Sequence, residues 1–489
     1  MKKSYYIYSV VLMLVFGSGC STDFLNISNP NELTEDTYFK NKSQLQSSVD
    51  ASYVNLQSKG LYIRHLFFMN DNMGHEVELN PQHEPDKRQY YNFTFDANHE
   101  GIFTYWDNCF RGINKANFVI SNQEKFENVS QDDIDRALGE THFMRAFYYH
   151  LLVTRFGGVP IYSELTSTPN PRATKEEVYQ FILEDLALAA QLLPVQANTE
   201  GGRASSGAAW ALKGKMHLYR QEWQEAKESF EKVTGYTLVD EYKDNFLEET
   251  EYNTESVFEV GFTREFGWSD QDTWWVEDAS GMQFVSLRGQ EYGWNDWFNS
   301  YPGDDLLDEY EANDPRYTAN FYTDGELFNN DTEVVSLPDH RAAWKKYQNY
   351  YQRPKEEIAS GINHRVIRYA DVLLMWAEAE NELGNSSKAI DLMNQVRTRV
   401  SMPLYGSSEM NANYPVSNKS EIFNAIVHER KVELAGEQVR YNDLLRWGLA
   451  ESFLQGTGFV KGKSELLPIP QKEIDVNPEI SAGDQNPGY

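Results

Sequence analysis

The chain has 489 residues, 40% of them hydrophobic and 24% charged, so it can bury a large core. Its formal net charge of -30 repels phosphate backbones and anionic bilayer faces, which argues against a nucleic-acid partner. Aromatic residues make up 14% of the chain, an excess that its function or its packing must explain.

The first predicted element is a lipoprotein signal peptide over residues 1–19. Lys2 and Lys3 form a positive start, residues 5–16 are mostly apolar, and the small residues 17–19 precede Cys20. A cysteine in this place can be acylated, so we expect Cys20 to begin the mature protein and to anchor it to a membrane through lipid. Such signals usually carry Leu three residues before the cysteine, where this chain has Gly, and an ordinary secretory signal is the alternative.

Helical periodicity predicts a scaffold in two parts, over residues of about 34–234 and about 366–448. A polar loop region interrupts the first part near residues 70–100. The segment of about 235–360 is rich in Gly, Asp, Asn, Trp and Tyr and has no sustained helical period, so it predicts a loop-rich, irregular second lobe. The expected fold class is therefore dominated by α-helices, with an irregular tail.

Both helical parts contain the spacing of a tetratricopeptide-like helical hairpin. Gly214 and Ala226 stand twelve residues apart, and so do Ala377 and Ala389, with large side chains four residues outside each pair. Small residues at such positions let two antiparallel helices approach closely. Two matches in one phase predict a scaffold of helical hairpins.

Signatures of catalysis and of metal binding are missing from the sequence. His75-Glu76 begins like a zinc-protease helix but lacks the second histidine that would share the metal. There is no nucleophile-elbow motif and no phosphate-binding glycine loop. A glycosidase needs two carboxylates at a fixed separation in space, and sequence alone does not define that separation. We expect no enzyme activity, no cofactor and no metal.

Tryptophans gather in the irregular segment and predict a glycan site there. The five are Trp268, Trp274, Trp275, Trp294 and Trp297. Sugar rings expose flat apolar C–H faces, and an indole offers a rigid surface of matching size. Trp274 and Trp275 are adjacent and cannot easily both face inward, so they are the strongest candidates. Each of the five could instead belong to the core of the lobe, because Trp is commonly buried.

A second, weaker group of candidates lies near residue 70. Asp71, Asn72 and His75 are polar and are expected in a loop between helices, where they could hydrogen-bond to sugar hydroxyls.

A series of ordered motifs resembles the SusD/RagB family of nutrient-binding lipoproteins, and the likeness runs from residue 20 to residue 489. The motifs are 23–26 (DFLN), 145–149 (RAFYY), 156–162 (FGGVPIY), 202–205 (GRAS), 208–212 (AAWAL), 367–375 (IRYADVLLM), 377–379 (AEA), 429–434 (ERKVEL), 440–444 (RYNDL), 467–470 (LPIP) and 485–489 (QNPGY). The resemblance implies one SusD-like domain over residues 20–489. It further implies that the protein binds oligosaccharide or polysaccharide at the cell surface and delivers it to a SusC-like TonB-dependent transporter of the outer membrane.

The shared motifs themselves are interpreted as scaffold. Gly157 and the glycine, valine and proline that follow it fit a helix stop. Arg368 and Asp371 are three residues apart on a predicted helix, as are Arg430 and Glu433, so each pair could form an ion pair on one helix face.

Three functions are compatible with the sequence. A surface glycan-binding lipoprotein explains the lipid signal, the hairpins, the aromatic excess and the missing catalytic motifs together. A structural tetratricopeptide-type adaptor of an outer-membrane complex, without sugar binding, is the second hypothesis, and a surface-attached glycoside hydrolase is the third. Because the chain is strongly acidic, a neutral glycan such as a glucan is favoured over a polyanionic one.

Overall fold

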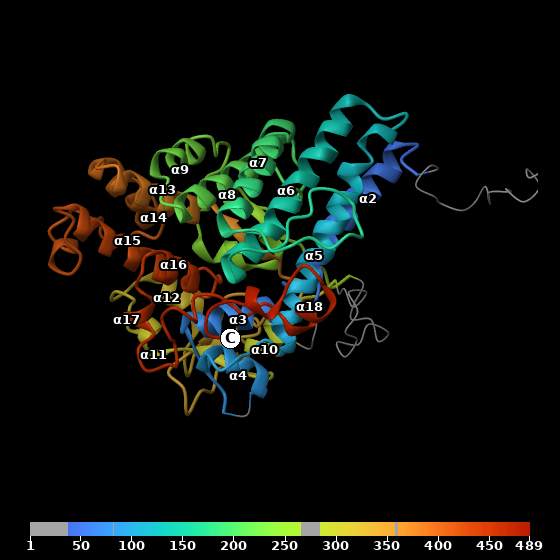
Figure 1. The fold of residues 1–489 in the computed structure, drawn as a ribbon. Coiled ribbons are helices and arrows are strands. Elements are labelled where there is room, and N and C mark those ends of the chain that lie inside the picture. Colours follow the sequence, from blue (N-terminus) through green and yellow to red (C-terminus); the bar gives the residue numbers. More distant parts are fainter. Residues whose placement is uncertain (1–37, 82, 266–283, 357–359) are drawn as a thin grey trace, which may run out of the picture.

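The computed structural model describes residues 38–81, 83–265, 284–356 and 360–489, and it confirms a fold dominated by helices (Figure 1). The helices are α2 (Lys42–Val54), α3 (His65–Gly74), α4 (Pro85–Asn92), α5 (Glu100–Ser121), α6 (Gln131–Phe156), α7 (Lys175–Leu192), α8 (Ser206–Tyr219), α9 (Trp223–Phe230), α10 (Arg288–Tyr292), α11 (Asp304–Leu307), α12 (Pro315–Asn320), α13 (Tyr369–Glu382), α14 (Ser386–Arg399), α15 (Lys419–Glu433), α16 (Arg440–Arg446), α17 (Ala450–Phe453) and α18 (Gln471–Val476). Within the described ranges, no helix is both long enough and apolar enough to pass through a bilayer.

Successive helices pack side by side as antiparallel hairpins. Helices α5 to α9 each contact the next along the chain, and α13 packs on α14, α15 and α9. The two hairpins expected from the small-residue spacing are α8–α9 and α13–α14. A Cβ on Gly214 would stand 2.4 Å from the Phe230 ring, and Ala377 and Ala389 are fully buried between their helices. The small residues therefore allow the close approach that was predicted.

Local sequence signals fix where these helices begin. The Thr174 hydroxyl accepts from the backbone of Glu177 while the Glu177 carboxylate accepts from the backbone of Thr174, a capping box that begins α7. Ser130 and Ser205 cap α6 and α8 through their hydroxyls. Helix α6 ends before Gly157, where the sequence predicted a stop.

The polar loop predicted near residues 70–100 is wrong. Helix α3 runs through residue 74, strand β1 (Val77–Leu79) and helix α4 follow, and α5 begins at residue 100. Every residue of α3 is buried, including Asn70, Asp71 and Asn72, whose side chains bond to Arg155, Tyr292 and Lys87 on other elements. Polarity in this stretch therefore reflects internal hydrogen bonding rather than exposure. The tail expected to be irregular also contains α18.

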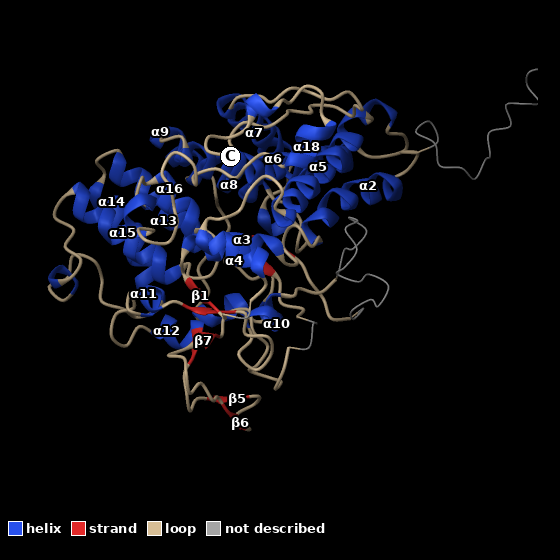
Figure 2. Cartoon of the chain, turned by 60° about the horizontal axis from the view of Figure 1, so that its bottom comes forward, coloured by secondary structure: helices blue, strands red, loops and turns tan. Residues whose placement is uncertain are grey.

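The second lobe holds short helices and two-stranded antiparallel pairs (Figure 2). The strands besides β1 are β2 (Ser256–Val260), β3 (Ser300–Pro302), β4 (Phe321–Tyr322), β5 (Leu327–Phe328), β6 (Glu333–Val334), β7 (Ala343–Trp344) and β8 (His364–Arg368). They pair as β1–β3, β2–β8, β4–β7 and β5–β6. Pairs this small are marginal alone and depend on packing against their surroundings. Strands β2 and β8 lie within the main helical core, through Phe258 and Ile367.

A buried network of arginines and carboxylates joins the lobe to the second helical part, and Glu433 is its centre. Glu433 contacts Arg316 of the lobe at 3.1 Å, Arg368 at 3.0 Å and Arg399 at 2.7 Å, and all four side chains are nearly inaccessible. Arg316 also binds Glu429 at 2.6 Å. Such a network holds only while each charge keeps its partners.

The two ion pairs predicted along single helices are not formed, because the four residues pair across elements instead. Arg430 binds Asp371 at 2.8 Å and Asp443 at 2.7 Å, while Arg368 binds Glu433. The four residues are buried, and so they link α13, α15, α16 and β8 rather than decorating one exposed helix face.

Candidate functional site

Several of the predicted site residues lie outside the described residues. These are Cys20, Trp268, Trp274 and Trp275. Their predicted roles, lipid attachment for the first and glycan contact for the other three, stay predictions.

Trp294 and Trp297 follow helix α10 and are both half-buried. The Trp294 ring packs edge-on against Phe328, with ring centres 5.1 Å apart, and against Tyr350 at 5.8 Å. Trp294 thus belongs in part to the core of the lobe. Trp297 is held by its backbone N–H, which donates to the carbonyl of Gln290 at 3.2 Å.

Asp71 and Asn72 lie inside the molecule. The Asp71 carboxylate accepts from the Tyr292 hydroxyl at 2.9 Å and from the Gln438 amide at 3.0 Å, and burial raises its pKa. The Asn72 amide donates to the carbonyl of Lys87 at 3.0 Å. The two side chains are 1% and 0% exposed, so the structure places neither where a glycan could reach it.

His75 occupies a different position, at the surface end of α3. It adopts the left-handed conformation that ends the helix, and its ring lies against that of Tyr91 with centres 4.1 Å apart. Its Nε2 is 2.9 Å from the carbonyl of Tyr91. Burial lowers the pKa of His75, so the ring is neutral at physiological pH. The neutral ring packs against one face of Tyr91.

Strand pairing brings two predicted regions together that are more than two hundred residues apart in sequence. Strand β1 follows His75, strand β3 follows Trp297, and the two pair antiparallel with Glu78 opposite Tyr301. The backbone bond from Asn80 to Asn299, at 3.2 Å, extends the pairing by one residue. The His75 end of α3 and the segment after Trp294 therefore share one face of the molecule.

That face carries four partly exposed rings beside an exposed carboxylate. We call this group the ribbon surface, and it consists of Glu78, Tyr91, Phe298, Tyr301 and His340. The rings of Tyr301 and His340 have centres 4.2 Å apart, and Phe298 is 4.9 Å from His340. The Tyr91 hydroxyl donates to the exposed Glu78 carboxylate at 3.2 Å.

Electrostatics keep both tyrosines of the ribbon surface neutral. Burial, and then the Glu78 carboxylate, raise the pKa of Tyr91 and of Tyr301 above the usual range. Each phenol therefore keeps its proton and can donate a hydrogen bond. Flat rings with hydroxyl and carboxylate groups at their edges suit a ligand that has both apolar faces and hydroxyls.

Tyr91, Tyr301 and His340 were not predicted, because only tryptophans were considered as sugar-stacking rings. One sequence signal for Tyr91 was present, since Tyr90 and Tyr91 are adjacent large rings that cannot easily both face inward. In the structure Tyr90 is fully buried while Tyr91 is half-buried. His340 and Tyr301 are brought together only by the fold of the lobe.

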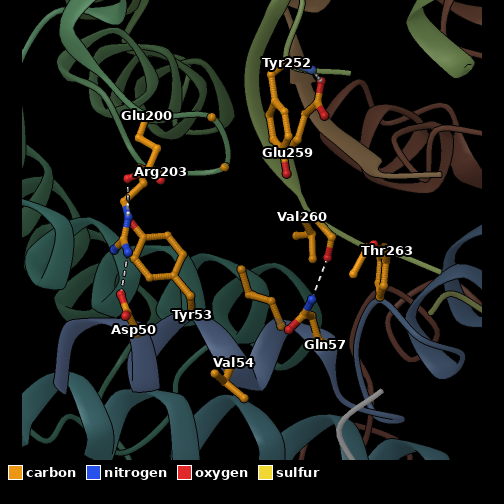
Figure 3. A pocket seen from close by; sticks show the side chains of 15 residues that line it. Asp50, Tyr53, Val54, Gln57, Glu200, Arg203, Tyr252, Glu259, Val260 and Thr263 are labelled. Carbon is orange, nitrogen blue, oxygen red and sulfur yellow. Dashed lines mark hydrogen bonds and ion pairs between the residues drawn. The ribbon is translucent and has the colours of Figure 1, made fainter. Parts of the chain in front are cut away.

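A separate pocket of about 390 Å3 lies beside α2 (Figure 3). Arg203 lies on one side, bound to Asp50 at 2.5 Å, and Tyr252 and Glu259 lie on the other. The Gln57 side chain lies below Val260 in this view, and its amide donates to the carbonyl of Gly261 at 2.6 Å. Because these polar groups are paired with one another, the pocket offers few groups to a ligand.

The segment that follows strand β2 forms part of the wall of this pocket. Thr263 lines it, and the Thr263 backbone N–H donates to the carbonyl of Phe284 at 2.6 Å. Tyr252, with 42% of its surface exposed, packs against Gly201, where a Cβ would stand 2.8 Å from the ring.

Comparison with known families identifies the chain. A model described as "SusD family" matches residues 238–462, and one described as "Starch-binding associating with outer membrane" matches residues 23–218. Together the two matches span most of the sequence, and the chain belongs to the SusD/RagB family.

The similarity to relatives and to solved structures extends over nearly the whole chain. SusD-like protein P2 of Formosa agariphila is 26% identical over all of both chains. A SusD superfamily protein of Bacteroides vulgatus superposes with a TM-score of 0.78 at 26% identity, covering 93% of this chain and all of the other. A structure described as a laminarin-binding SusD-like protein gives the same TM-score and identity, covering 92% of this chain and all of the other.

Proposed function

We propose that the protein is a non-enzymatic glycan-binding lipoprotein of the outer-membrane surface, which binds a neutral glucan on the ribbon surface and delivers it to a SusC-like TonB-dependent transporter. The observation that carries the glycan site is the β1–β3 pairing, which sets Glu78 opposite Tyr301. Tyr91 bonds to Glu78 and the His340 ring lies against Tyr301, so the rings gather around this pair. Partly exposed rings edged by hydrogen-bonding groups are what a sugar ring requires.

Charge and similarity both support a neutral glucan. Glu78 and Asp304 are exposed near Tyr301, so a polyanionic glycan would meet like charge there. One similar structure is described as a laminarin-binding SusD-like protein, and because laminarin is a neutral glucan this favours the same ligand class here.

Removing the two tyrosine rings is the direct test. The double change Tyr91→Ala and Tyr301→Ala is expected to weaken binding of laminarin about tenfold or more, since central aromatic contacts each contribute upwards of about 1 kcal/mol. Affinity electrophoresis in gels with and without laminarin measures the retardation. The matched control is Phe453→Ala, which removes a ring that is 48% exposed on a different element, α17.

The predicted tryptophan site is tested in the same gels with the double change Trp274→Ala and Trp275→Ala. If this pair abolishes retardation while the tyrosine pair leaves it intact, the site is on the tryptophan-rich segment and the ribbon surface is not it. The packed hairpins α8–α9 and α13–α14 favour one other function, a structural adaptor without sugar binding. A parent protein that no neutral glycan retards would support the adaptor.

Anchoring and transport have their own test. Cys20→Ala is expected to leave the protein unprocessed or soluble, because several acyl chains give stable membrane attachment and their loss removes it. A Cys20→Ala protein that stays in the membrane fraction after a high-salt wash, with no transporter bound, would contradict the lipid anchor.

The transporter partner is tested with the lipidated parent. Extracted gently from native membranes, the parent is expected to co-purify with a TonB-dependent barrel. Repeated purification of the parent alone would contradict this partner.

A further inference from the structure

Helix α15 meets the second lobe at a short acidic turn, residues 308–314, which joins α11 to α12. Glu309 and Glu311 of this turn both contact His428 on α15. Nδ1 of His428 lies 2.6 Å from Oε1 of Glu309, and Nε2 lies 3.1 Å from Oε1 of Glu311. We call these three residues the His428 latch, because together they attach the turn to the helix.

Two carboxylates on opposite sides of one imidazole determine its protonation. An ionised carboxylate only accepts hydrogen bonds, so each ring nitrogen of His428 must donate. A neutral imidazole carries one N–H and satisfies one carboxylate, whereas an imidazolium carries two and satisfies both. Burial alone would raise the pKa values of Glu309 and Glu311, but hydrogen bonds to His428 and to neighbouring cations lower both to about 2. Both glutamates are therefore ionised at neutral pH, and the geometry requires a charged ring between them.

Two further cations share the carboxylates of the latch. Lys431, three residues along α15 from His428, binds Glu309 at 2.9 Å, and Arg397 of α14 binds Glu311 at 2.8 Å. Each carboxylate thus keeps one cation when His428 loses its proton. Deprotonation therefore weakens the attachment of the turn without removing it altogether.

The other neighbours of the ring are aromatic or acidic. The Tyr414 ring, from the segment before α15, stacks on His428 with centres 3.9 Å apart, and its hydroxyl donates to Glu309 at 3.1 Å. Burial, and then Glu309, raise the pKa of Tyr414, so this phenol keeps its proton. A tyrosine face attracts a cation, which favours the charged imidazole. Glu429, next to His428 on α15, adds negative charge and binds Arg397 at 3.0 Å.

The contribution of the latch to stability depends on pH from both sides. Burial opposes the charge on His428, but its carboxylate neighbours outweigh burial and raise the pKa above 6.5. The folded protein then binds this proton more tightly than the unfolded chain does, so the stability is fully present below about 6.5 and is lost as the pH rises through the folded pKa. The stability from Glu309 and Glu311 is present above 4.5 and is lost as the pH falls towards about 2. The latch is therefore complete in weakly acidic solution and weakens on the alkaline side.

We propose that the His428 latch is a pH-sensitive attachment between the second lobe and helix α15. With its proton, His428 donates to both carboxylates and holds the acidic turn on the helix. Without the proton it can donate to one of them, and its other nitrogen turns a lone pair towards a carboxylate, so the turn opens more often. This device does not depend on any ligand and goes beyond the proposed function.

Melting temperatures of the parent and of His428→Gln, measured at about pH 6 and about pH 9.5, test the sign of this effect. At the lower pH the variant is expected to melt about 2–4 °C below the parent, as the loss of a charged hydrogen bond implies. At the higher pH the difference is expected to shrink, because the parent has lost the proton as well. Lys346, whose pKa burial lowers to about 8, titrates in both proteins and cancels in the comparison. An equal difference at both pH values would show that His428 acts as an uncharged ring and would overturn the proposal.

His75→Gln is the matched control, because burial lowers the pKa of His75 instead of raising it. The unfolded chain then binds this proton more tightly than the folded protein does. The stability that His75 contributes relative to glutamine therefore rises as the pH rises through about 6.5. Its melting-temperature difference is expected to change in the opposite direction from that of His428→Gln, and the same direction for both would contradict the charge assigned to His428.

NMR of protein labelled selectively at histidine gives a readout that a purely structural role of His428 would not change. The His428 signal is identified by its absence from the spectrum of His428→Gln, and its titration midpoint in the parent is expected above 6.5. Glu311→Gln removes one of the two carboxylates and is expected to lower that midpoint. A parent midpoint at or below 6.5, or one that Glu311→Gln leaves unchanged, would overturn the proposal.

Hydrogen exchange measures the opening of the turn itself. Peptides that cover residues 304–314 are compared between the parent and His428→Gln at one pH, so that the intrinsic exchange rates cancel. Exchange in the variant is expected to be about fivefold faster or more. Unchanged exchange would show that the latch does not hold the turn. Because no residue of the latch belongs to the ribbon surface, these outcomes leave the proposed glycan site untouched.

Discussion

Glu433→Gln is expected to lower the free energy of unfolding by about 3–5 kcal/mol, because it leaves buried arginines without their shared carboxylate. Burial alone would raise the pKa of Glu433. The neighbouring guanidinium groups of Arg399, Arg368 and Arg316 outweigh this effect and hold the pKa well below the usual range, so Glu433 is ionised in the folded protein. The neutral amide keeps the shape of the side chain but removes the charge that compensates three guanidinium groups.

Urea denaturation of the parent and the variant measures this difference. Glu451→Gln is the control, because it breaks an ion pair with Lys461 in which both side chains are mostly exposed. The control is expected to leave the denaturation midpoint nearly unchanged. Equal shifts for the two variants would show that the network around Glu433 adds nothing beyond a surface pair.

Gly158→Ala is expected to destabilise the protein by about 3 kcal/mol, near the upper end for an overpacked site. A Cβ at this position would stand 2.1 Å from the backbone carbonyl oxygen of Ala173. That carbonyl cannot move aside easily, because the Ala173 N–H donates to Val159 at 3.1 Å and the Arg172 guanidinium donates to the Gly158 carbonyl at 2.7 Å.

The matched control for Gly158 is Gly483→Ala, where the nearest atom to the added Cβ is the Ser481 hydroxyl oxygen at 3.4 Å. Differential scanning calorimetry of the two variants compares their melting temperatures. If the Gly158→Ala protein melts at the same temperature as the control, the backbone at residues 172–173 can shift at little cost in free energy.

The helical scaffold could be predicted from sequence because its signals are local. Small residues twelve apart and capping residues such as Thr174 act within one hairpin, and the structure confirms the α8–α9 and α13–α14 hairpins.

Burial of polar residues could not be predicted in the same way. Asp71 was predicted to lie in a loop because it is polar. In the structure it is buried, and its carboxylate accepts hydrogen bonds from Tyr292 and Gln438, which are more than two hundred residues away in sequence. The same holds for Arg368 and Arg430, which were expected to pair within one helix and instead pair with carboxylates on other elements. A helical period shows which residues share a face, but not which distant element covers it.

The candidate site was predictable only in part for the same reason. His75 follows the end of α3 and is half-buried, whereas Asp71 and Asn72 lie within that helix and are buried, and polarity alone did not distinguish the three residues. Tyr301 is brought near Tyr91 by the β1–β3 pairing and near His340 by the fold of the lobe, and no local sequence pattern predicts either contact.

The β1–β3 pairing also sets the order in which the protein can become functional. Tyr91 belongs to the part of the chain that emerges first, and Tyr301 and His340 follow after another two hundred residues, so the ribbon surface does not exist until that contact closes. Contacts between residues so far apart in sequence form slowly, because the entropy of closing a long loop is lost before the contacts contribute any stabilising energy. An N-terminal fragment ending at residue 218 would hold the first hairpins and Tyr91 but only half of the ribbon surface. The proposed glycan site is thus completed late in folding, and its appearance during refolding marks the joining of the two halves of the chain.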